Sequence, residues 1–419
     1  MTATERSGPT PAAEPAPATR RAEFDAIRML VVLGLVFFHA ALIFDTRDDF
    51  YVKNPQTTEA ITFAAGFAVV WAMPALFLIA GSGAWHSLRR RGPAGFAVER
   101  MLRLGVPLLF ATVAILPVPQ WLRLKAADPG YGESYPRFWL RFFDVRLSLS
   151  DFPFMVRGEF FESGHLWFVV LLLAFCLMLA LAARLPSGRM SRVRDAAAAA
   201  VARRGVVLLP AIPVAVVAAV LGMEETFAGW HRWAYLLFFC YGLALASDDR
   251  FRHAMRRDAV PAAVAGLVLF GASGIAFGTL GGDPFTDTTI PAGLARLSFG
   301  AAGWCWLVAI LGLSDRRRPA RPRATTKEPP RGRRRVYAYL AEAVLPLYVL
   351  HQPIVVAVAY IVVRWHMPAP VKYVVIVAVS FVIMFTIYDL LVRRTRPTRF
   401  LFGIRSDRTH PRPGTSSAQ

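Results

Sequence analysis

The chain has 419 residues, of which 55% are hydrophobic and 18% are charged, whereas ordinary soluble domains have about 25% charged residues. This composition excludes a soluble globular enzyme, a disordered protein and a fibrous repeat, and the long apolar blocks indicate a helical membrane protein. The net charge is +20. Because the basic residues lie between the apolar blocks, we expect contacts with membrane lipids and no nucleic-acid partner.

In chain order, residues 1–22 are rich in Pro, Ala and Thr and predict a disordered cytoplasmic tail. Residues 23–395 then contain ten apolar blocks, which predict an all-α transmembrane bundle of about ten spans. Residues 396–419 are expected to form a cytoplasmic C-terminal tail. The expected spans are 26–44, 60–85, 101–120, 165–184, 205–222, 232–247, 259–280, 291–313, 338–363 and 372–392.

The distribution of Lys and Arg predicts the orientation of this bundle. An even number of spans places both termini on one side, and most of the 48 Lys and Arg residues then fall in segments on that side. By the positive-inside rule that side is the cytoplasm, so we expect a multi-pass protein of the cell inner or plasma membrane. The long outer loop, 121–164, is expected to form short helices at the outer surface, and Pro210 and Pro213 are expected to kink the fifth span.

The first expected span carries two candidate functional residues. Arg28 lies near its cytoplasmic boundary, and His39 follows 11 positions later, about 16 Å along a helix and on the same face. His39 therefore lies about halfway into a hydrocarbon core of about 30 Å. An ionisable residue at this depth is a functional candidate by default. The alternative is an arginine that pairs with Asp25, together with a structural histidine.

The span expected at 338–363 runs in the same direction and contains a second histidine at the same depth. His351 lies 13 residues into this span, as His39 does in the first. Matching depth is consistent with one shared polar cavity. Tyr348 lies on the same helical face as His351, and Pro353 should free a backbone carbonyl near the site. A polar packing cluster is the alternative.

Two further arginines, Arg100 and Arg103, are spaced to lie on one helical face. Together with Arg28 they predict an anion site at the cytoplasmic face, because guanidinium groups match phosphate oxygens well. The alternative is a topology signal with lipid headgroup contacts. The nearby stretch from Gly81 to Ala84 has small residues that allow close approach of a helix or a ligand, and helix packing is the more frequent explanation.

The fourth expected span begins with a histidine and an aromatic residue at the outer surface. Trp167 is typical of an interfacial anchor, and His165 is a candidate to face an external acceptor. Three charged residues inside other spans, Arg296, Glu342 and Asp389, are each expected to have a protein partner, because an unpaired charge in a membrane is costly.

Taken in this order, the motifs resemble those of acyltransferase 3, a family of integral membrane acyltransferases. The resemblance extends over about residues 20–405, and the C-terminal segment from Tyr388 to Phe402 is similar to the glucan biosynthesis protein C branch, which succinylates periplasmic glucans. One departure is Leu76, where the family usually has a second aromatic residue. The motifs are Phe24-Asp25-Ala-Ile-Arg28 with His39, Phe77-Leu-Ile-Ala-Gly81, Arg100-Met-Leu-Arg103 with Pro107, His165-Leu-Trp167-Phe168 and Leu347-Tyr348-Val-Leu-His351-Gln-Pro353.

The resemblance implies that an acyl group, acetyl or succinyl, moves from cytoplasmic acyl-CoA to a hydroxyl of an extracytoplasmic acceptor such as a glycan. It implies acyl-CoA as a substrate, with no tightly bound cofactor and no metal. His39 would act as a general base or carry the acyl group itself. The other roles would be phosphate binding by Arg28, Arg100 and Arg103, orientation or carbonyl polarisation by His351 and Tyr348, and acceptor contact by His165 and Trp167.

Two other classes of function fit a bundle with buried polar residues. A transporter of an anionic metabolite or lipid also needs polar groups inside the membrane. The transporter hypothesis, however, does not explain why two histidines lie at the same depth in the middle of the membrane. A scaffold for envelope enzymes would not depend on any of these side chains. Release of CoA from acyl-CoA by the purified protein separates the enzyme from both.

Overall fold

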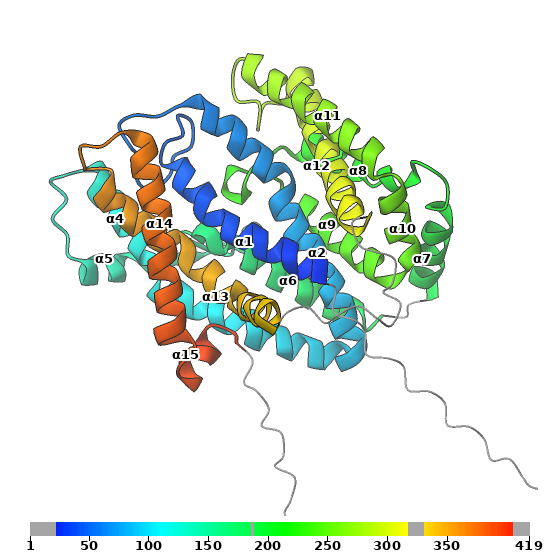
Figure 1. Ribbon diagram of the computed structural model, residues 1–419, viewed down its shortest axis with the longest axis horizontal. Helices are drawn as coiled ribbons and strands as arrows, with labels where there is room; N and C mark the ends of the chain where they lie inside the picture. The colour runs from blue at the N-terminus through cyan, green and yellow to red at the C-terminus, as the bar shows by residue number, and fades with distance from the viewer. Residues whose placement is uncertain (1–21, 186–187, 317–330, 405–419) are drawn as a thin grey trace, which may run out of the picture.

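We describe the fold from a computed structural model, in which residues 22–185, 188–316 and 331–404 are described. The expected N-terminal tail lies almost entirely outside the described residues, as does most of the loop between the eighth and ninth expected spans. Almost all secondary structure in the described ranges is helical, which confirms the all-α prediction (Figure 1). The one sheet within these ranges is an antiparallel hairpin of β1 (Val145–Leu147) and β2 (Val156–Gly158).

The helices follow the apolar blocks of the sequence closely, and short helices fill the long outer loop as expected. Pro210 caps the start of α8, so the fifth block is interrupted at this proline. The helices are α1 (Ala22–Leu42), α2 (Glu59–Arg100), α3 (Val106–Ala114), α4 (Pro117–Ala127), α5 (Tyr135–Phe142), α6 (Trp167–Ala182), α7 (Gly188–Ala200), α8 (Ala211–Leu221), α9 (Arg232–Ser247), α10 (Asp249–Arg257), α11 (Ala259–Thr279), α12 (Ile290–Arg316), α13 (Arg331–Val362), α14 (Ala369–Ile387) and α15 (Arg396–Leu401).

Seven helical segments in the described ranges are long and apolar enough to cross a membrane. One of them, Glu59–Ala127, has 69 residues, although a single crossing needs only about 20. Val206–Leu221 is a shorter apolar helix, and α9 has 16 residues. The protein is therefore a multi-pass membrane protein with an all-α bundle. The count of ten spans and the cytoplasmic termini stay predictions.

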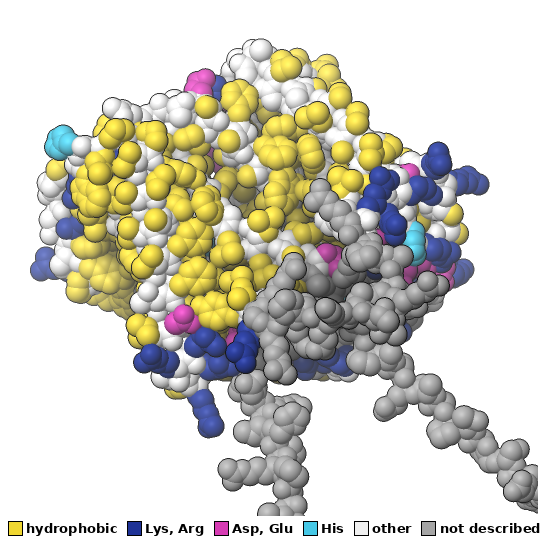
Figure 2. Space-filling view, in the orientation of Figure 1, with side chains coloured by type: hydrophobic (Ala, Val, Ile, Leu, Met, Phe, Trp, Pro, Cys, Tyr) yellow, Lys and Arg dark blue, Asp and Glu magenta, His cyan; other side chains and the backbone are white. Residues whose placement is uncertain are grey.

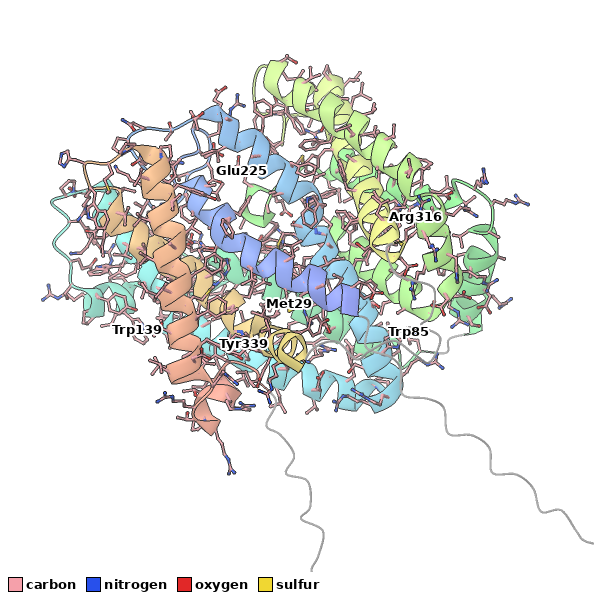
Figure 3. The ribbon with its side chains drawn as sticks, viewed as in Figure 1. Met29, Trp85, Trp139, Glu225, Arg316 and Tyr339 are labelled. Carbon is pink, nitrogen blue, oxygen red and sulfur yellow. The ribbon has the colours of Figure 1, made fainter. Side chains whose placement is uncertain are left out.

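The two ends of the bundle differ in charge. The end where α1 and α13 begin and α12 ends, here called the arginine end, holds the ion pairs Arg252–Asp315 and Arg399–Glu342. The opposite end, where α1 ends and α14 begins, is called the loop end. Figure 2 shows hydrophobic side chains over most of the visible face, with Lys and Arg gathered along its lower and right margins. In Figure 3, Trp85 of α2 and Arg316 at the end of α12 lie on the right, and Glu225 lies to their upper left.

The connection between the second and third expected spans, 86–100, contains a kink in place of a loop. Two helical stretches of α2 meet at Gly92, which is not helical and has a positive φ of 69°. Pro93 then begins the next helical turn, as proline favours the first turn of a helix. One glycine and one proline thus redirect the chain, which a search for apolar blocks cannot detect.

Close helix packing accounts for the small residues of α2. A Cβ atom added to Gly81 would lie 2.0 Å from the carbonyl oxygen of Phe239, and one added to Gly242 would lie 2.0 Å from that of Leu78. The backbones of α2 and α9 are therefore in direct contact at two glycines, one from each helix. This confirms packing as the explanation of Gly81.

The three charged residues inside expected spans all have protein partners, as predicted. Arg296 donates to the carbonyl oxygens of Pro284 and Ala219, at 2.8 and 3.2 Å. Glu342 pairs with an arginine of α15 at 3.0 Å, and Asp389 pairs with Arg393 at 3.2 Å.

The segment expected to begin the C-terminal tail is folded as far as residue 404. It forms α15, and Phe402 packs against Phe110 of α3 with ring centroids 5.3 Å apart.

Candidate active site

Three histidines from distant parts of the sequence meet inside the bundle. His39 lies near the end of α1, His351 lies in the middle of α13, and His165 lies in the short 3-10 turn Gly164–Leu166 before α6. The ring centroids of His39 and His351 are 5.1 Å apart, and those of His351 and His165 are 5.0 Å apart. The two histidines predicted at equal depth are thus neighbours, and His351 lies between the other two. We call them the histidine cluster.

A proline in α13 explains how His165 joins this cluster. Pro353 has no N–H, so it cannot bond to the carbonyl of Val349 four residues earlier. That carbonyl instead bonds to His165 Nε2 at 3.0 Å. Because a carbonyl oxygen only accepts hydrogen bonds, Nε2 carries the proton. The carbonyl freed by Pro353 was expected near the site, and here it holds the third histidine.

The same argument fixes the tautomer of His351. Its Nδ1 bonds to the carbonyl oxygen of Tyr348 at 2.5 Å, so Nδ1 carries the proton and Nε2 carries a lone pair. His351 Nε2 is buried and has no hydrogen-bond partner in the described part of the chain, and the same holds for Nδ1 of His39 and of His165. Buried polar atoms almost always have partners. Three imidazole nitrogens without one, in adjacent rings, indicate a site for a polar ligand.

Tyr348 packs against the histidine cluster and positions two of its members. Its hydroxyl donates to the backbone carbonyl oxygen of His165, and its ring packs against both His165 and His351, at centroid distances of 5.7 and 5.5 Å. The one hydroxyl proton is therefore already used. This geometry favours the predicted positioning role of Tyr348 over polarisation of a carbonyl.

The three rings differ in exposure. His351 is 1% exposed and His165 is 5% exposed, so His165 lies inside the protein rather than facing an external solution. His39 is only partly buried, which makes it the member of the cluster that a substrate reaches most readily. This difference agrees with the role predicted for His39.

Trp167 lies away from the histidines, in an aromatic cluster. It is 7% exposed, and its ring packs against Tyr235, Phe77 and Phe227 at 5.2, 6.3 and 5.7 Å. The structure therefore gives Trp167 a packing environment in place of the interfacial position that the sequence suggested. Its contact with an acceptor stays a prediction.

The three arginines predicted to bind phosphate contact two carboxylates, and Arg100 and Arg103 share one of them. Arg28 donates to Asp25 at 2.7 Å, which is the local pair that the sequence left open as an alternative. Arg100 and Arg103 lie 3.2 and 3.8 Å from the carboxylate of Glu99. All three are at the arginine end, and their joint binding of one anion stays a prediction.

Sequence reasoning missed the residues that cover the cluster at the loop end. Phe50 stacks on His39 with centroids 5.7 Å apart, and the neighbouring Tyr51 donates a hydrogen bond to Glu162. Both aromatic residues lie in a loop between two spans, where no periodicity marks them. The only signals were Glu162, three residues before His165, and Gln352, which is next to His351 and buried.

In the described part of the chain, no group of three or more His, Cys, Asp or Glu residues is placed to hold a metal ion. The histidine cluster has the chemistry that acid–base catalysis needs. Neutral imidazoles with free lone pairs accept protons, which is the most frequent role of histidine in catalysis.

Comparisons with known proteins identify the family of the chain. Glucans biosynthesis protein C from Escherichia coli O6:K15:H31 and from strain K12 are each 28% identical to the chain over 158 residues. The matched region is 38% of this chain and 37% of those relatives, so it covers little more than a third of their length. No solved structure matches. The family model of acyltransferase 3, described as an acyltransferase domain, matches residues 21–389, and the chain therefore belongs to the acyltransferase 3 family of membrane proteins.

Proposed function

We propose that this protein is an O-acyltransferase that moves an acyl group from acyl-CoA at the arginine end to a hydroxyl of an acceptor at the loop end. The observation that carries the proposal is the set of three partnerless imidazole nitrogens in adjacent rings inside the bundle. A cluster of this kind suits proton transfer at a point that both substrates reach from opposite ends.

The donor would bind through its charged part. The 3′,5′-ADP portion of CoA carries phosphates, and Arg28, Arg100 and Arg103 provide guanidinium groups at the arginine end. Their side chains keep between 15% and 38% of their surface exposed, so they remain reachable. The narrow pantetheine arm would extend into the bundle and place the thioester beside His39. By the positive-inside rule this end faces the cytoplasm, where acyl-CoA is made.

The reaction would proceed at His39. As the general base, its imidazole takes the proton of the acceptor hydroxyl while the hydroxyl oxygen bonds to the acyl carbon. The carbon–sulfur bond then breaks, and the CoA thiolate leaves and takes the proton back from the imidazole. His351, held in one tautomer by Tyr348, provides a lone pair at Nε2 toward the same space. An acyl group carried transiently on His39 would use the same residues.

The acceptor is proposed to be an extracytoplasmic glycan. The relatives from Escherichia coli are named for glucan biosynthesis. Membership of an acyltransferase family is consistent with acyl transfer to the hydroxyl groups of such a glycan. Acetyl and succinyl are the acyl groups proposed.

The test compares cells that express the wild-type protein, the His39→Ala variant, or neither. Mass spectrometry of envelope glycans and extracted metabolites should show an acyl mass increment that depends on the protein and on His39. An unchanged set of masses in all three strains would refute the enzyme and favour a transporter or a scaffold. A variant that is present in the membrane at the wild-type level and forms normal product would refute the role of His39.

A further inference from the structure

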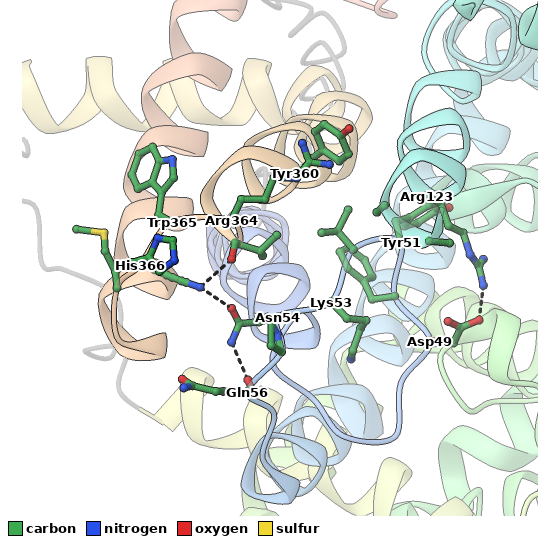
Figure 4. A pocket seen from close by; sticks show the side chains of 18 residues that line it. Asp49, Tyr51, Lys53, Asn54, Gln56, Arg123, Tyr360, Arg364, Trp365 and His366 are labelled. Atoms are coloured by element: carbon green, nitrogen blue, oxygen red, sulfur yellow. Dashed lines mark hydrogen bonds and ion pairs between the residues drawn. The ribbon is translucent and has the colours of Figure 1, made fainter. Parts of the chain in front are cut away.

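A pocket of about 740 Å³ opens at the loop end (Figure 4). Four segments line it: the loop from 49 to 56, the end of α4 near Arg123, the last turn of α13 with the residues that follow it (from Tyr360 to Met367), and Lys372 of α14. Aromatic rings and planar polar groups both line this pocket, which we call the loop pocket. Such a lining suits a polyhydroxylated molecule, because rings pack on C–H faces and polar groups bond to hydroxyls.

One side chain belongs both to this pocket and to the histidine cluster. Phe50 lines the loop pocket, and its ring lies nearly parallel to the imidazole of His39, with 24° between the planes. Phe50 is 6% exposed. The ring therefore forms the wall between the loop pocket and His39, and an acceptor in the pocket reaches the imidazole only when this ring moves aside.

The loop that carries Phe50 is tied to the rest of the site by its next residue. Tyr51 packs edge-on against Phe50, with centroids 5.4 Å apart, and its hydroxyl donates to Glu162. A Cβ atom added to Gly164, which has a φ of 44°, would lie 3.2 Å from that hydroxyl. Tyr51 thus rests on the same short turn that carries His165, so the position of Phe50 is coupled to the cluster.

Further hydrogen bonds hold both sides of this loop. Lys53 donates to the carbonyl oxygens of Leu42 and Asp48, each at 2.8 Å. Lys372 donates to Asn54 at 3.0 Å. Phe50 lies between these anchors in the sequence, and its side chain makes none of these hydrogen bonds, so the ring can move without breaking them.

We propose that the loop pocket receives the acyl acceptor and that Phe50 keeps water away from the acyl donor at His39 until the acceptor displaces its ring. This inference rests on the proposed function, since it concerns the same acyl transfer. Without the ring, water would take the place of the acceptor. Its oxygen would bond to the acyl carbon, the carbon–sulfur bond would break, and the proton held by His39 would pass to the CoA thiolate, giving a free carboxylic acid and CoA.

The test measures hydrolysis of acetyl-CoA and succinyl-CoA by the purified full-length protein with no acceptor present. Phe50→Ala should release CoA at least about fivefold faster than the wild type, because an open site admits water. Phe38→Ala is the matched control. Phe38 also packs edge-on against His39, with centroids 5.3 Å apart, but it does not line the loop pocket. The double variant Phe50→Ala with His39→Ala should lose the added hydrolysis.

The outcomes separate this proposal from the proposed function. If Phe50→Ala and the wild type hydrolyse acyl-CoA at equal rates, and size-exclusion chromatography shows that both proteins are folded, the role of Phe50 is overturned. An equal rise in Phe38→Ala and Phe50→Ala would overturn it too, since any lost ring would then admit water. If no acylated product forms in cells with the wild-type protein, the proposed function fails instead. Tyr51→Phe, which removes the hydroxyl that bonds to Glu162, should raise hydrolysis less than Phe50→Ala does, and the absence of any rise would overturn the coupling of Tyr51 to the wall.

Discussion

The histidine cluster and the arginine end are built in opposite ways. The histidines come from residues 39, 165 and 351 and meet through tertiary contacts, and each keeps a ring nitrogen without a partner. The candidate arginines are paired locally: Arg28 lies three residues from Asp25, and Arg100 and Arg103 lie within four residues of Glu99.

This difference shows which part of the molecule is arranged for chemistry. Leaving buried nitrogens without hydrogen bonds costs about 1–3 kcal/mol each, so a fold that keeps three of them together retains them for a ligand. Arginines with a carboxylate neighbour are already stable without one. They can exchange a carboxylate for a phosphate at little cost, which suits a substrate that arrives and leaves in every cycle.

The largest effect is expected at the histidines. His39→Ala and His351→Ala should each lower the rate of acyl transfer about 10²–10⁴-fold, the range typical of a lost general base, while the affinity for acyl-CoA stays close to that of the wild type. Release of CoA in the presence of the acceptor and equilibrium binding of acyl-CoA measure the two quantities. Transfer by His351→Ala at the wild-type rate would show that the cluster is structural.

The arginine end should show the reverse pattern, with a smaller effect. Arg28→Ala and Arg103→Ala should each raise the KM for acyl-CoA about tenfold, since a hydrogen bond to a charged group contributes roughly 1.5–3 kcal/mol, and should leave the KM for the acceptor unchanged. Arg89→Ala is the matched control, because Arg89 is exposed at the same end and packs over Trp85. If all three variants behave alike, these arginines serve topology and stability only.

The histidine pair could be predicted because depth in a membrane can be counted along a helix. Two residues at the same distance into parallel spans lie at the same level, and α1 and α13 pack side by side. It could also be predicted that Arg296, Glu342 and Asp389 have partners, because an unpaired charge inside a membrane is costly. Which residue is the partner in each case could not be predicted.

Other features depend on contacts between segments that are far apart in the sequence. The place of His165 follows from the carbonyl of Val349, 184 residues away, and Phe50 reaches His39 because Lys53 and Lys372 hold its loop. Neither contact leaves a periodic pattern. The helical stretches within residues 86–100 were missed because the charge of this region suggested a loop, whereas the chain turns at Gly92 and Pro93.

A smaller effect is expected where α13 positions His165. Pro353→Ala restores an N–H that competes with His165 Nε2 for the carbonyl of Val349, so His165 should lose its fixed orientation. We expect kcat to fall about fivefold, in line with the roughly 1 kcal/mol of one hydrogen bond, with the KM for acyl-CoA unchanged. His165→Ala in the same chain should add little, because both changes act on one interaction.

The control for this change is on the same helix. Pro346 is also inside α13, about two helical turns before Pro353. Pro346→Ala therefore makes the same chemical change at another point of the same helix. A fall in kcat of the same size in both variants would mean that the bend of α13, and not the bond to His165, is what matters.

The smallest effect concerns the stability of the loop that covers the cluster. Burial, with Asp45 and Asp49 nearby and against the opposing effect of Lys53, raises the pKa of Asp48 from 3.8 to about 6. The folded protein therefore binds this proton more tightly than the unfolded chain does, and the free energy of unfolding falls as the pH rises from about 4 to about 6. At pH 7 the ionised carboxylate destabilises the fold. The loop crowds the Asp48 carboxyl, but the residue as a whole keeps much of its surface in contact with water, which screens the charge. Asp48→Asn should therefore be more stable than the wild type at pH 7 by no more than about 0.5 kcal/mol, and the two should be equally stable near pH 4. Thermal unfolding in detergent at both pH values measures this difference.

Asp49→Asn is the control with the opposite expectation, because it removes the partner of Arg123 and should lower the stability. If both substitutions raise the stability at pH 7, the negative charge of the loop as a whole limits its stability, rather than the burial of Asp48.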